Sequence, residues 1–219
     1  MKLISLNCGL PREVAWHGRT VSTGIFKHSL AGRIALRKLN LDSDRQADLT
    51  VHGGEDKAVY CYPFEHYEFW KSELPGRELL MGHFGENFTT EGLSEDSVYI
   101  GDRFSIGHAE VVVTQPRLPC YKLGIRFDDD GMPKRFLASR RTGFYLSVAR
   151  EGEVAAGDEI RLLSRDPILV PVSEITRLYV LKHYAGADIT SIHRTLQVPA
   201  FPESWKKYFR ERIEQRIEA

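Results

Sequence analysis

The alternation of apolar and polar residues predicts a chain that begins as short β-strands separated by turn residues. Residues 2–7 and 21–25 alternate in this way, and residues 11–18 read as a connection between them. The β pattern is clearest farther on, in three closely spaced segments: 98–100, 103–106 and 109–114. Gly107 and His108, between the last two of these segments, predict a tight hairpin loop.

A pair of similar turns indicates how these strands are arranged. Gly101-Asp102 and Gly157-Asp158 each open an alternating strand. Two such hairpin elements in a chain of short strands favour a closed or nearly closed β-barrel, because closure removes exposed sheet edges.

Helical spacing marks two regions of the chain. In residues 63–74 the spacing of Tyr67 and Trp70 places both rings on one helix face. After Pro167 the composition changes, and three amphipathic helices are expected, starting near Ser173, Asp188 and Ser204. These three helices carry no catalytic pattern, and we expect them to serve packing or partner binding.

The predicted organisation is therefore mainly β. A β-barrel with peripheral helices is expected over residues 1–165, followed by a small C-terminal three-helix domain over residues 166–219. A length of 219 residues with 42% hydrophobic content is enough for one full core and such an appendage.

Charge and cysteine usage narrow the class of protein. Thirty basic and thirty acidic residues give zero formal charge, so nothing marks the chain as a binder of nucleic-acid polymers or membranes. No apolar run approaches membrane-spanning length. Cys8, Cys61 and Cys120 are far apart and form no CxxC pair, which favours a reducing compartment over a disulfide framework. We expect a soluble cytoplasmic protein.

The strongest candidate for chemistry is the segment Gln115–Cys120, with the sequence QPRLPC. The β-branched run before it cannot continue through Pro116 and Pro119, so a stiff loop should present Arg117 and Cys120. A thiol near a guanidinium is favoured as the thiolate, the form that attacks or binds metal. A half-buried structural cysteine explains the same segment equally well.

Weaker candidates lie elsewhere in the chain. Gly53-Gly54 allows positive φ or a close approach to a ligand, with Lys57 close behind, although a plain turn explains this pattern as well. Asn87 could orient a heterocycle through its amide or cap a turn. Patterns typical of hydrolases, P-loop nucleotidases and zincins are missing from the sequence. A reactive cysteine among local cations would suit an anionic cofactor; these cations are Arg33, Lys57, Arg117, Lys122, Arg140 and Arg141.

Four segments in this order resemble the MOSC domain: Ala47–Tyr60, Phe84–Thr89, Ile100–Asp102 and Gln115–Cys120. The length of the chain and its helical tail are similar to the YiiM group within that family. The resemblance implies a MOSC-type barrel that binds the molybdenum cofactor, a pyranopterin phosphate carrying molybdenum.

The resemblance also assigns expected roles to particular residues. It implies that Cys120 supplies a thiolate to molybdenum, which suits a soft ligand. Lys57 and Arg117, with Arg140 or Arg141, would neutralise the phosphate and the pterin-dithiolene. The remaining matched positions would shape the pocket: Asp48, His52, Gly53, Gly54 and Asn87.

By the same resemblance, the expected activity is reduction of N-hydroxylated small molecules such as 6-hydroxylaminopurine, a mutagenic base analogue. Electrons would come from a flavin or iron–sulfur partner protein, because three scattered cysteines cannot hold a cluster. Two alternatives stay open: a sulfur carrier with a persulfide on Cys120, and a non-catalytic cofactor carrier. Deleting the chain after Pro167 should spare cofactor binding and could cost solubility or homodimer formation.

Overall fold

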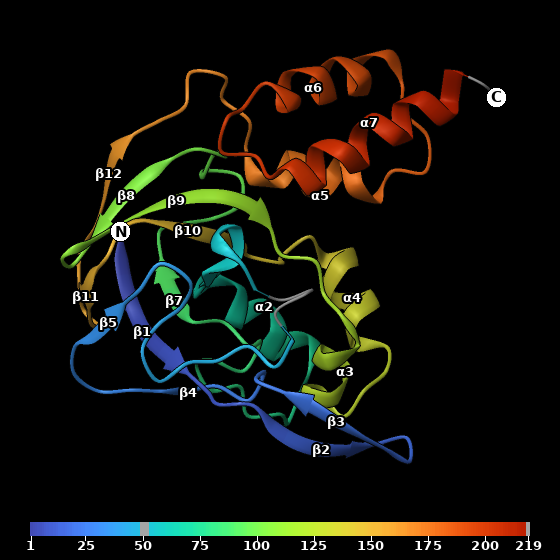
Figure 1. Cartoon of the computed structure of the whole chain (residues 1–219). Helices are drawn as coiled ribbons and strands as arrows, with labels where there is room; N and C mark the ends of the chain where they lie inside the picture. Colours follow the sequence, from blue (N-terminus) through green and yellow to red (C-terminus); the bar gives the residue numbers. More distant parts are fainter. Residues whose placement is uncertain (49–52, 218–219) are drawn as a thin grey trace.

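An eight-stranded sheet forms the body of the protein (Figure 1). The structure, a computed structural model, describes residues 1–48 and 53–217. The strands run in the order β12-β8-β9-β10-β6-β7-β1-β4, and every neighbouring pair is antiparallel except β6 with β7. Their bounds are β1 (Lys2–Cys8), β4 (His28–Ser29), β6 (Val59–Pro63), β7 (Phe88–Glu91), β8 (Arg103–Ile106), β9 (Ala109–Pro116), β10 (Phe144–Arg150) and β12 (Ile160–Ser164).

The sheet curls until its far edge reaches the start of β1. Leu3 N donates to Asp158 O at 3.0 Å, and Ile160 N donates to Met1 O at 2.9 Å. The contact is confined to the first residues of β1, because the other end of the same strand edge pairs with β4. Among the described residues, then, the sheet is curled but no closed barrel is found, and the fold is mixed, with helices beside the sheet.

Two short ladders flank the large sheet. Strands β5 (Ile34–Leu36) and β11 (Gly152–Val154) form one, and β2 (Arg12–Trp16) and β3 (Arg19–Thr23) form the other. The prediction of a connection over residues 11–18 is therefore wrong. This hairpin is largely exposed, so its strands lack the apolar alternation of a half-buried strand.

A second strand prediction also differs from the structure. Residues 98–100 do not form a strand and make only a single bridge, from Tyr99 to Pro171. Ile100 N donates to Val170 O at 2.9 Å, so this apolar segment anchors the start of the C-terminal helices and does not join the sheet. The hairpin at Gly107-His108, by contrast, is confirmed between β8 and β9.

Three helices cover one part of the sheet: α2 (Glu65–Glu73), α3 (Tyr121–Phe127) and α4 (Met132–Ser139). The helix predicted over residues 63–74 is confirmed as α2, which buries Tyr67 and Trp70. These two rings pack in an aromatic cluster with Phe84 and Phe136. The sequence did not predict α3 or α4.

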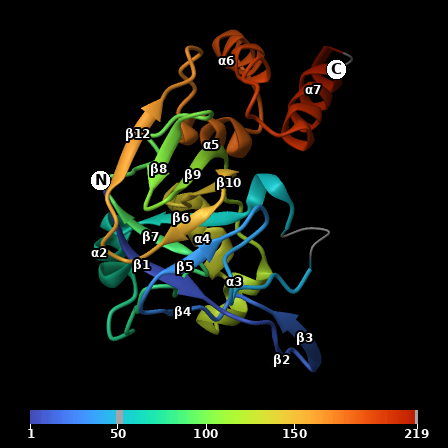
Figure 2. The same cartoon turned by 60° about the vertical axis from the view of Figure 1, so that its left-hand side comes forward.

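The three C-terminal helices are confirmed as α5 (Val172–Val180), α6 (Gly186–Leu196) and α7 (Glu203–Ile217). They lie together at one end of the sheet, beyond β8 and β9 (Figures 1 and 2). Their buried side chains, including Ile175, Trp205 and Phe209, belong to the same apolar core as Val111 and Val113 of β9. The domain boundary after residue 165 stays a prediction.

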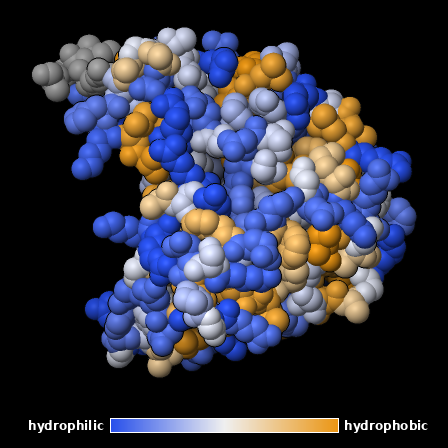
Figure 3. Space-filling view, turned by 180° about the vertical axis from the view of Figure 1, so that it is seen from behind, coloured by the Kyte–Doolittle hydropathy of each residue, from blue (hydrophilic) through white to orange (hydrophobic). Residues whose placement is uncertain are grey.

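The face seen in Figure 3 carries mostly polar side chains with scattered apolar patches. The same view shows a notch at the left edge, between the C-terminal helices and the sheet-bearing body. Across the part of the chain that the structure describes, no helix combines the length and apolar character needed to cross a membrane.

Candidate functional site

The loop after β9 presents Arg117 and Cys120 as the sequence predicts. Arg117 N donates to Gly143 O at 3.1 Å, so the chain stays against β10 for one residue beyond Pro116. Residues 117–120 are irregular, and α3 begins at Tyr121. Cys120 is the residue just before that helix, has an extended backbone and is half-buried. Cys8 and Cys61 are buried, and burial raises the pKa of each thiol to about 12.

Cys120 opens onto a cavity that encloses about 90 Å³ and widens towards solvent. Four of the predicted site residues meet there, namely Lys57, Asn87, Arg117 and Cys120. The other lining residues are Thr23, Gly24, Ile25, Lys27, Asp44, Arg45, Gln46, Ala47, Tyr60, Gly85, Lys122 and Tyr145. Cations outnumber carboxylates in this lining, which favours an anionic ligand.

Arg117 is buried, with a relative exposure of 5%. Its Cζ lies 4.9 Å from the ring centre of Tyr60 and 5.2 Å from that of Phe136. Its Nη1 is buried without a hydrogen-bond partner, and within residues 1–48 and 53–217 no carboxylate forms an ion pair with it. Because a buried unpaired charge is costly, this arrangement calls for a bound anion.

Two tyrosines form a neutral wall of the cavity. Tyr60 and Tyr145 face each other across the β6–β10 pairing, with ring centres 5.5 Å apart. The Tyr60 hydroxyl donates to Thr142 O at 2.8 Å. Burial raises the pKa of both phenols, so they stay protonated and do not compete with a ligand anion for Arg117.

Lys57 reaches the cavity from a single turn of 3-10 helix, η1 (Glu55–Lys57). Gly54 begins this turn with φ of 96°, a conformation that favours glycine. Desolvation lowers the pKa of Lys57, and the negative charge of Asp56 partly opposes that effect. The turn is fixed to β9, because Thr114 Oγ1 donates to Asp56 O at 2.7 Å.

The floor of the cavity is a buried polar network around Asp44. Asp44 is fully buried and forms an ion pair with Lys27. Asn87 Nδ2 donates to Asp44 Oδ2 at 2.9 Å, while Asn87 Oδ1 accepts from Tyr60 N at 3.1 Å. The amide of Asn87 is therefore used in joining protein segments. Asp44 also accepts from Gly9 N at 2.9 Å.

Close backbone approach gives the cavity its remaining wall. A Cβ on Gly24 would lie 2.5 Å from Arg45 O, so only glycine lets these two segments meet. The contact brings residues 23–27 and 44–47 together beside Cys120.

Other predicted site residues lie away from this lining. Arg140 and Arg141 line a separate cavity. Its lining also includes His66 of α2, Glu95 and residues at the start of α5. Arg140 ends α4 in a left-handed conformation with φ of 57°, and this turn carries both arginines away from Cys120. Arg141 Cζ instead lies 4.1 Å from the ring centre of Phe69. Asp48, Gly53 and Gly54 do not line the Cys120 cavity, and His52 lies outside the described residues.

Several lining residues were not among the predicted site residues. The sequence indicates Lys122 only as a local cation, and the first turn of α3 brings it to the cavity. Tyr60 and Tyr145 meet only through strand pairing, so no spacing along the chain indicates them. Within the described residues, no group of three or more histidine, cysteine or carboxylate side chains could hold a metal ion, so a metal here would need ligands from a cofactor.

Comparison with known proteins identifies the family. The family model of the MOSC domain matches residues 48–161, which is more than half of the chain, so the chain belongs to the MOSC family. The model described as "YiiM-like, 3-alpha helix domain" matches residues 170–216. The chain therefore belongs to the YiiM group of the MOSC family.

Individual relatives agree with this assignment. The chain is 40% identical to the "Uncharacterized protein YflK" of Bacillus subtilis over 94% of this chain and 92% of that protein. It is 36% identical to "Protein YiiM" of Escherichia coli, over 87% and 84% respectively. The crystal structure of YiiM from Geobacillus stearothermophilus superposes with a TM-score of 0.80 at 32% identity, over 96% of this chain and 98% of that one.

A fourth relative is longer. A protein of Gibberella moniliformis named "Reductase" is 33% identical over 74% of this chain, which corresponds to 29% of that protein.

Proposed function

We propose that this chain binds the molybdenum cofactor in the Cys120 cavity and reduces N-hydroxylated small molecules such as 6-hydroxylaminopurine. Membership of the MOSC family supports the cofactor, because the family is known for binding it. The fungal relative named "Reductase" supports the direction of the chemistry. The observation that carries the proposal is the buried guanidinium of Arg117, unpaired with any carboxylate of the described chain, beside the Cys120 thiol.

The residues present fit an anionic, metal-bearing group. Cys120 would supply one soft thiolate ligand, and the remaining donors would belong to the cofactor. Arg117 and Lys57 would neutralise its negative charges, with Lys122 as an additional cation at the same cavity. The enclosed volume is small, so a pyranopterin would be enclosed only in part.

When bound, the cofactor would supply the two-electron redox chemistry for reduction of the N-hydroxyl group. Reduction of an N-hydroxyl compound takes two electrons and two protons, breaks the N–O bond, and yields the amine and water. Lys57 is the group in this cavity suited to donate a proton, because desolvation lowers the pKa of its ammonium. Tyr60 and Tyr145 would stay neutral and hold the substrate side of the cavity away from bulk water.

The electrons would come from a partner protein with a flavin or an iron–sulfur cluster. The three cysteines of this chain do not gather into a cluster site: Cys8 and Cys61 are buried core residues with strongly raised thiol pKa values. We propose that, of the three cysteines, only Cys120 takes part in the chemistry.

The test is elemental analysis for molybdenum on protein from a cofactor-competent host, wild type beside Cys120→Ser. We expect near-stoichiometric molybdenum in the wild type and its loss in the variant. The variant should keep its circular dichroism spectrum, since the half-buried thiol lies in a loop. With a reduced viologen dye as electron donor, the wild type should then reduce 6-hydroxylaminopurine and the Cys120→Ser variant should not.

Other outcomes would contradict parts of the proposal. Molybdenum without turnover by any donor would make the protein a cofactor carrier. No molybdenum in either protein, with the host's cofactor supply verified and sulfane sulfur found on Cys120, would make it a sulfur carrier.

A further inference from the structure

A side-chain hydrogen bond joins the C-terminal helices to the strand that leads into the candidate site. Trp205 of α7 donates its indole Nε1–H to Gln115 Oε1 of β9 at 2.6 Å. Both side chains are buried, with relative exposures of 7% and 3%. The two residues are 90 positions apart in the sequence, so this contact depends on how the helices sit on the sheet.

The other end of the same amide helps the Thr114 hydroxyl to hold the turn that carries Lys57. Gln115 Nε2 donates to the main-chain oxygen of Asp56 at 3.2 Å. Asp56 immediately precedes Lys57, and Gln115 lies two residues before Arg117. One glutamine side chain therefore connects α7, the Lys57 turn and the strand that leads to Arg117.

The chemistry of these partners fixes the orientation of the amide. An indole nitrogen can only donate a hydrogen bond, and a main-chain carbonyl can only accept one. With Trp205 donating to the amide oxygen, the NH₂ group has to face Asp56 O. Without the indole donor, the Gln115 amide would be held on one side only, by its bond to Asp56 O, and would be less firmly positioned.

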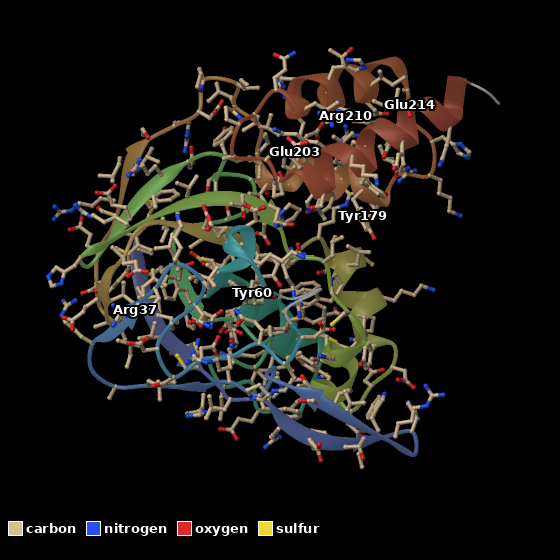
Figure 4. The ribbon with its side chains drawn as sticks, viewed as in Figure 1. Arg37, Tyr60, Tyr179, Glu203, Arg210 and Glu214 are labelled. Carbon is tan, nitrogen blue, oxygen red and sulfur yellow. The ribbon has the colours of Figure 1, made fainter. Side chains whose placement is uncertain are left out.

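The helices also contact the loop that follows. Leu118 packs against the apolar core and lines a groove with Tyr179, Trp205 and Tyr208. Figure 4 shows Tyr179 on the side of the C-terminal helices that faces the body of the protein, where Tyr60 lies among the strands. The C-terminal helices thus contact the chain on both sides of Arg117.

We propose that Trp205 is a positioning residue for the Cys120 cavity, and that it acts through Gln115 to hold the Asp56–Lys57 turn in place. The C-terminal helices then complete the site and do not serve only as a packing or partner module. The role of this turn in cofactor binding rests on the proposed function, whereas the positioning itself is a property of the cofactor-free chain.

The test measures Lys57 directly in the full-length, cofactor-free protein. Reductive methylation with ¹³C-formaldehyde gives each lysine an NMR signal that can be titrated, and Lys57→Arg identifies the signal of Lys57. Trp205→Phe removes the indole donor, and Gln115→Met removes both bonds while keeping the side chain neutral and of similar length. Tyr184→Phe is the matched control, because it removes a buried donor from the connection between α5 and α6, the Tyr184 hydroxyl bonded to Leu178 O at 3.1 Å.

Desolvation lowers the pKa of Lys57 against the charge of Asp56. If the turn loosens, the ammonium gains water, and we expect its titration midpoint to rise by about half a unit or more in Trp205→Phe and Gln115→Met. The control should keep the wild-type midpoint. The variant that combines Trp205→Phe with Gln115→Met should show the same Lys57 midpoint as Gln115→Met alone, because Trp205 would act only through Gln115.

An unchanged Lys57 midpoint in both folded variants would overturn the proposal, as would an equal shift in Tyr184→Phe. If Trp205→Phe does not fold, Gln115→Met decides alone. These titrations need no molybdenum, so failure of the cofactor assignment would leave their result intact. If the cofactor binds, Trp205→Phe should also retain it about threefold less well or worse, as expected for the loss of one well-made hydrogen bond.

Discussion

The guanidinium carbon of Arg117 lies 4.9 Å from the centre of the Tyr60 ring, on a buried side chain with no carboxylate paired to it in the described chain. Aromatic rings stabilise a cation only partly, and the unpartnered Nη1 keeps its desolvation cost. Arg117 is thus placed where it costs the folded protein stability and favours an anion in the cavity.

Replacing this cation should separate stability from ligand binding. We expect Arg117→Met to raise the free energy of unfolding of the cofactor-free protein by about 1 kcal/mol or more, because an apolar side chain replaces an unpaired buried charge. The same variant should lose most of its molybdenum. Urea unfolding and elemental analysis measure the two effects.

Arg37→Met is the control for Arg117→Met, since Arg37 is exposed and its ion pair with Asp42 spans 3.2 Å. Neither quantity should change appreciably in that variant. A cofactor-free Arg117→Met protein less stable than the wild type would mean that the guanidinium is a structural group.

A second prediction concerns the ion pair between Lys27 and Asp44 at the floor of the cavity. Asp44 is fully buried against Lys27 and also accepts from Gly9 N and Asn87 Nδ2. Asp44→Asn should leave the Lys27 ammonium buried without its counter-charge and lower the free energy of unfolding by about 3–5 kcal/mol.

The comparison variant is Asp42→Asn, which breaks the exposed pair with Arg37 and should cost less than about 1 kcal/mol. Urea denaturation of both proteins gives the difference directly. Equal losses in the two variants would show that burial does not distinguish the two ion pairs.

A buried histidine, His83, is predicted to make the stability of the folded protein depend on pH. Desolvation, reinforced by the charges of Arg126 and Arg77, lowers the pKa of His83 from 6.5 to about 4. Its Nδ1 lies 3.1 Å from Arg126 Nη2, which suits the neutral ring as an acceptor. Between pH 6.5 and 4 the unfolded chain binds a proton that the folded protein does not. Stability should therefore be complete above pH 6.5, fall as the pH drops through this window, and level off below it.

The total loss from His83 is of the order of 3 kcal/mol, at about 1.4 kcal/mol for each pKa unit. His83→Asn, whose Oδ1 can replace Nδ1 as the acceptor, should remove this part of the pH dependence. His17, an exposed histidine paired with Asp130, is the control position. A His83→Asn protein that loses stability between pH 6.5 and 4 as steeply as the wild type would assign the effect to other groups.

The sequence predicts those elements whose signal is local. The loop at Arg117 and Cys120 follows from two prolines after an apolar strand, and the C-terminal helices follow from their apolar spacing. Helix α3 escapes prediction because it has only seven residues and a single pair of buried side chains at helical spacing, Leu123 and Phe127.

The sequence predicts a site residue correctly only where both its side-chain chemistry and its position in the fold can be inferred from neighbouring residues. Arg140 and Arg141 carry the right charge, but the left-handed turn after α4 directs them to another cavity. Lys27 and Asp44 look like ordinary surface residues in the sequence, and only the fold buries them as a pair. The link from Trp205 to Gln115 joins segments too distant for any spacing rule to connect.

The last prediction concerns the core that the C-terminal helices share with β9. It replaces the expectation from sequence that the chain can be cut after Pro167 without loss of the site. Deleting residues 168–219 would uncover the face of β9 that packs against α5 and leave Gln115 without its indole donor. We expect the fragment to be insoluble or to lack a cooperative unfolding transition, because a large apolar surface would face water. Soluble yield and thermal denaturation followed by circular dichroism measure this, with Tyr184→Phe in the full chain as the comparison for a mild loss of helix packing. A soluble fragment that melts cooperatively and keeps molybdenum would show that the sheet holds the site without the helices, and would contradict the role given to Trp205 as well.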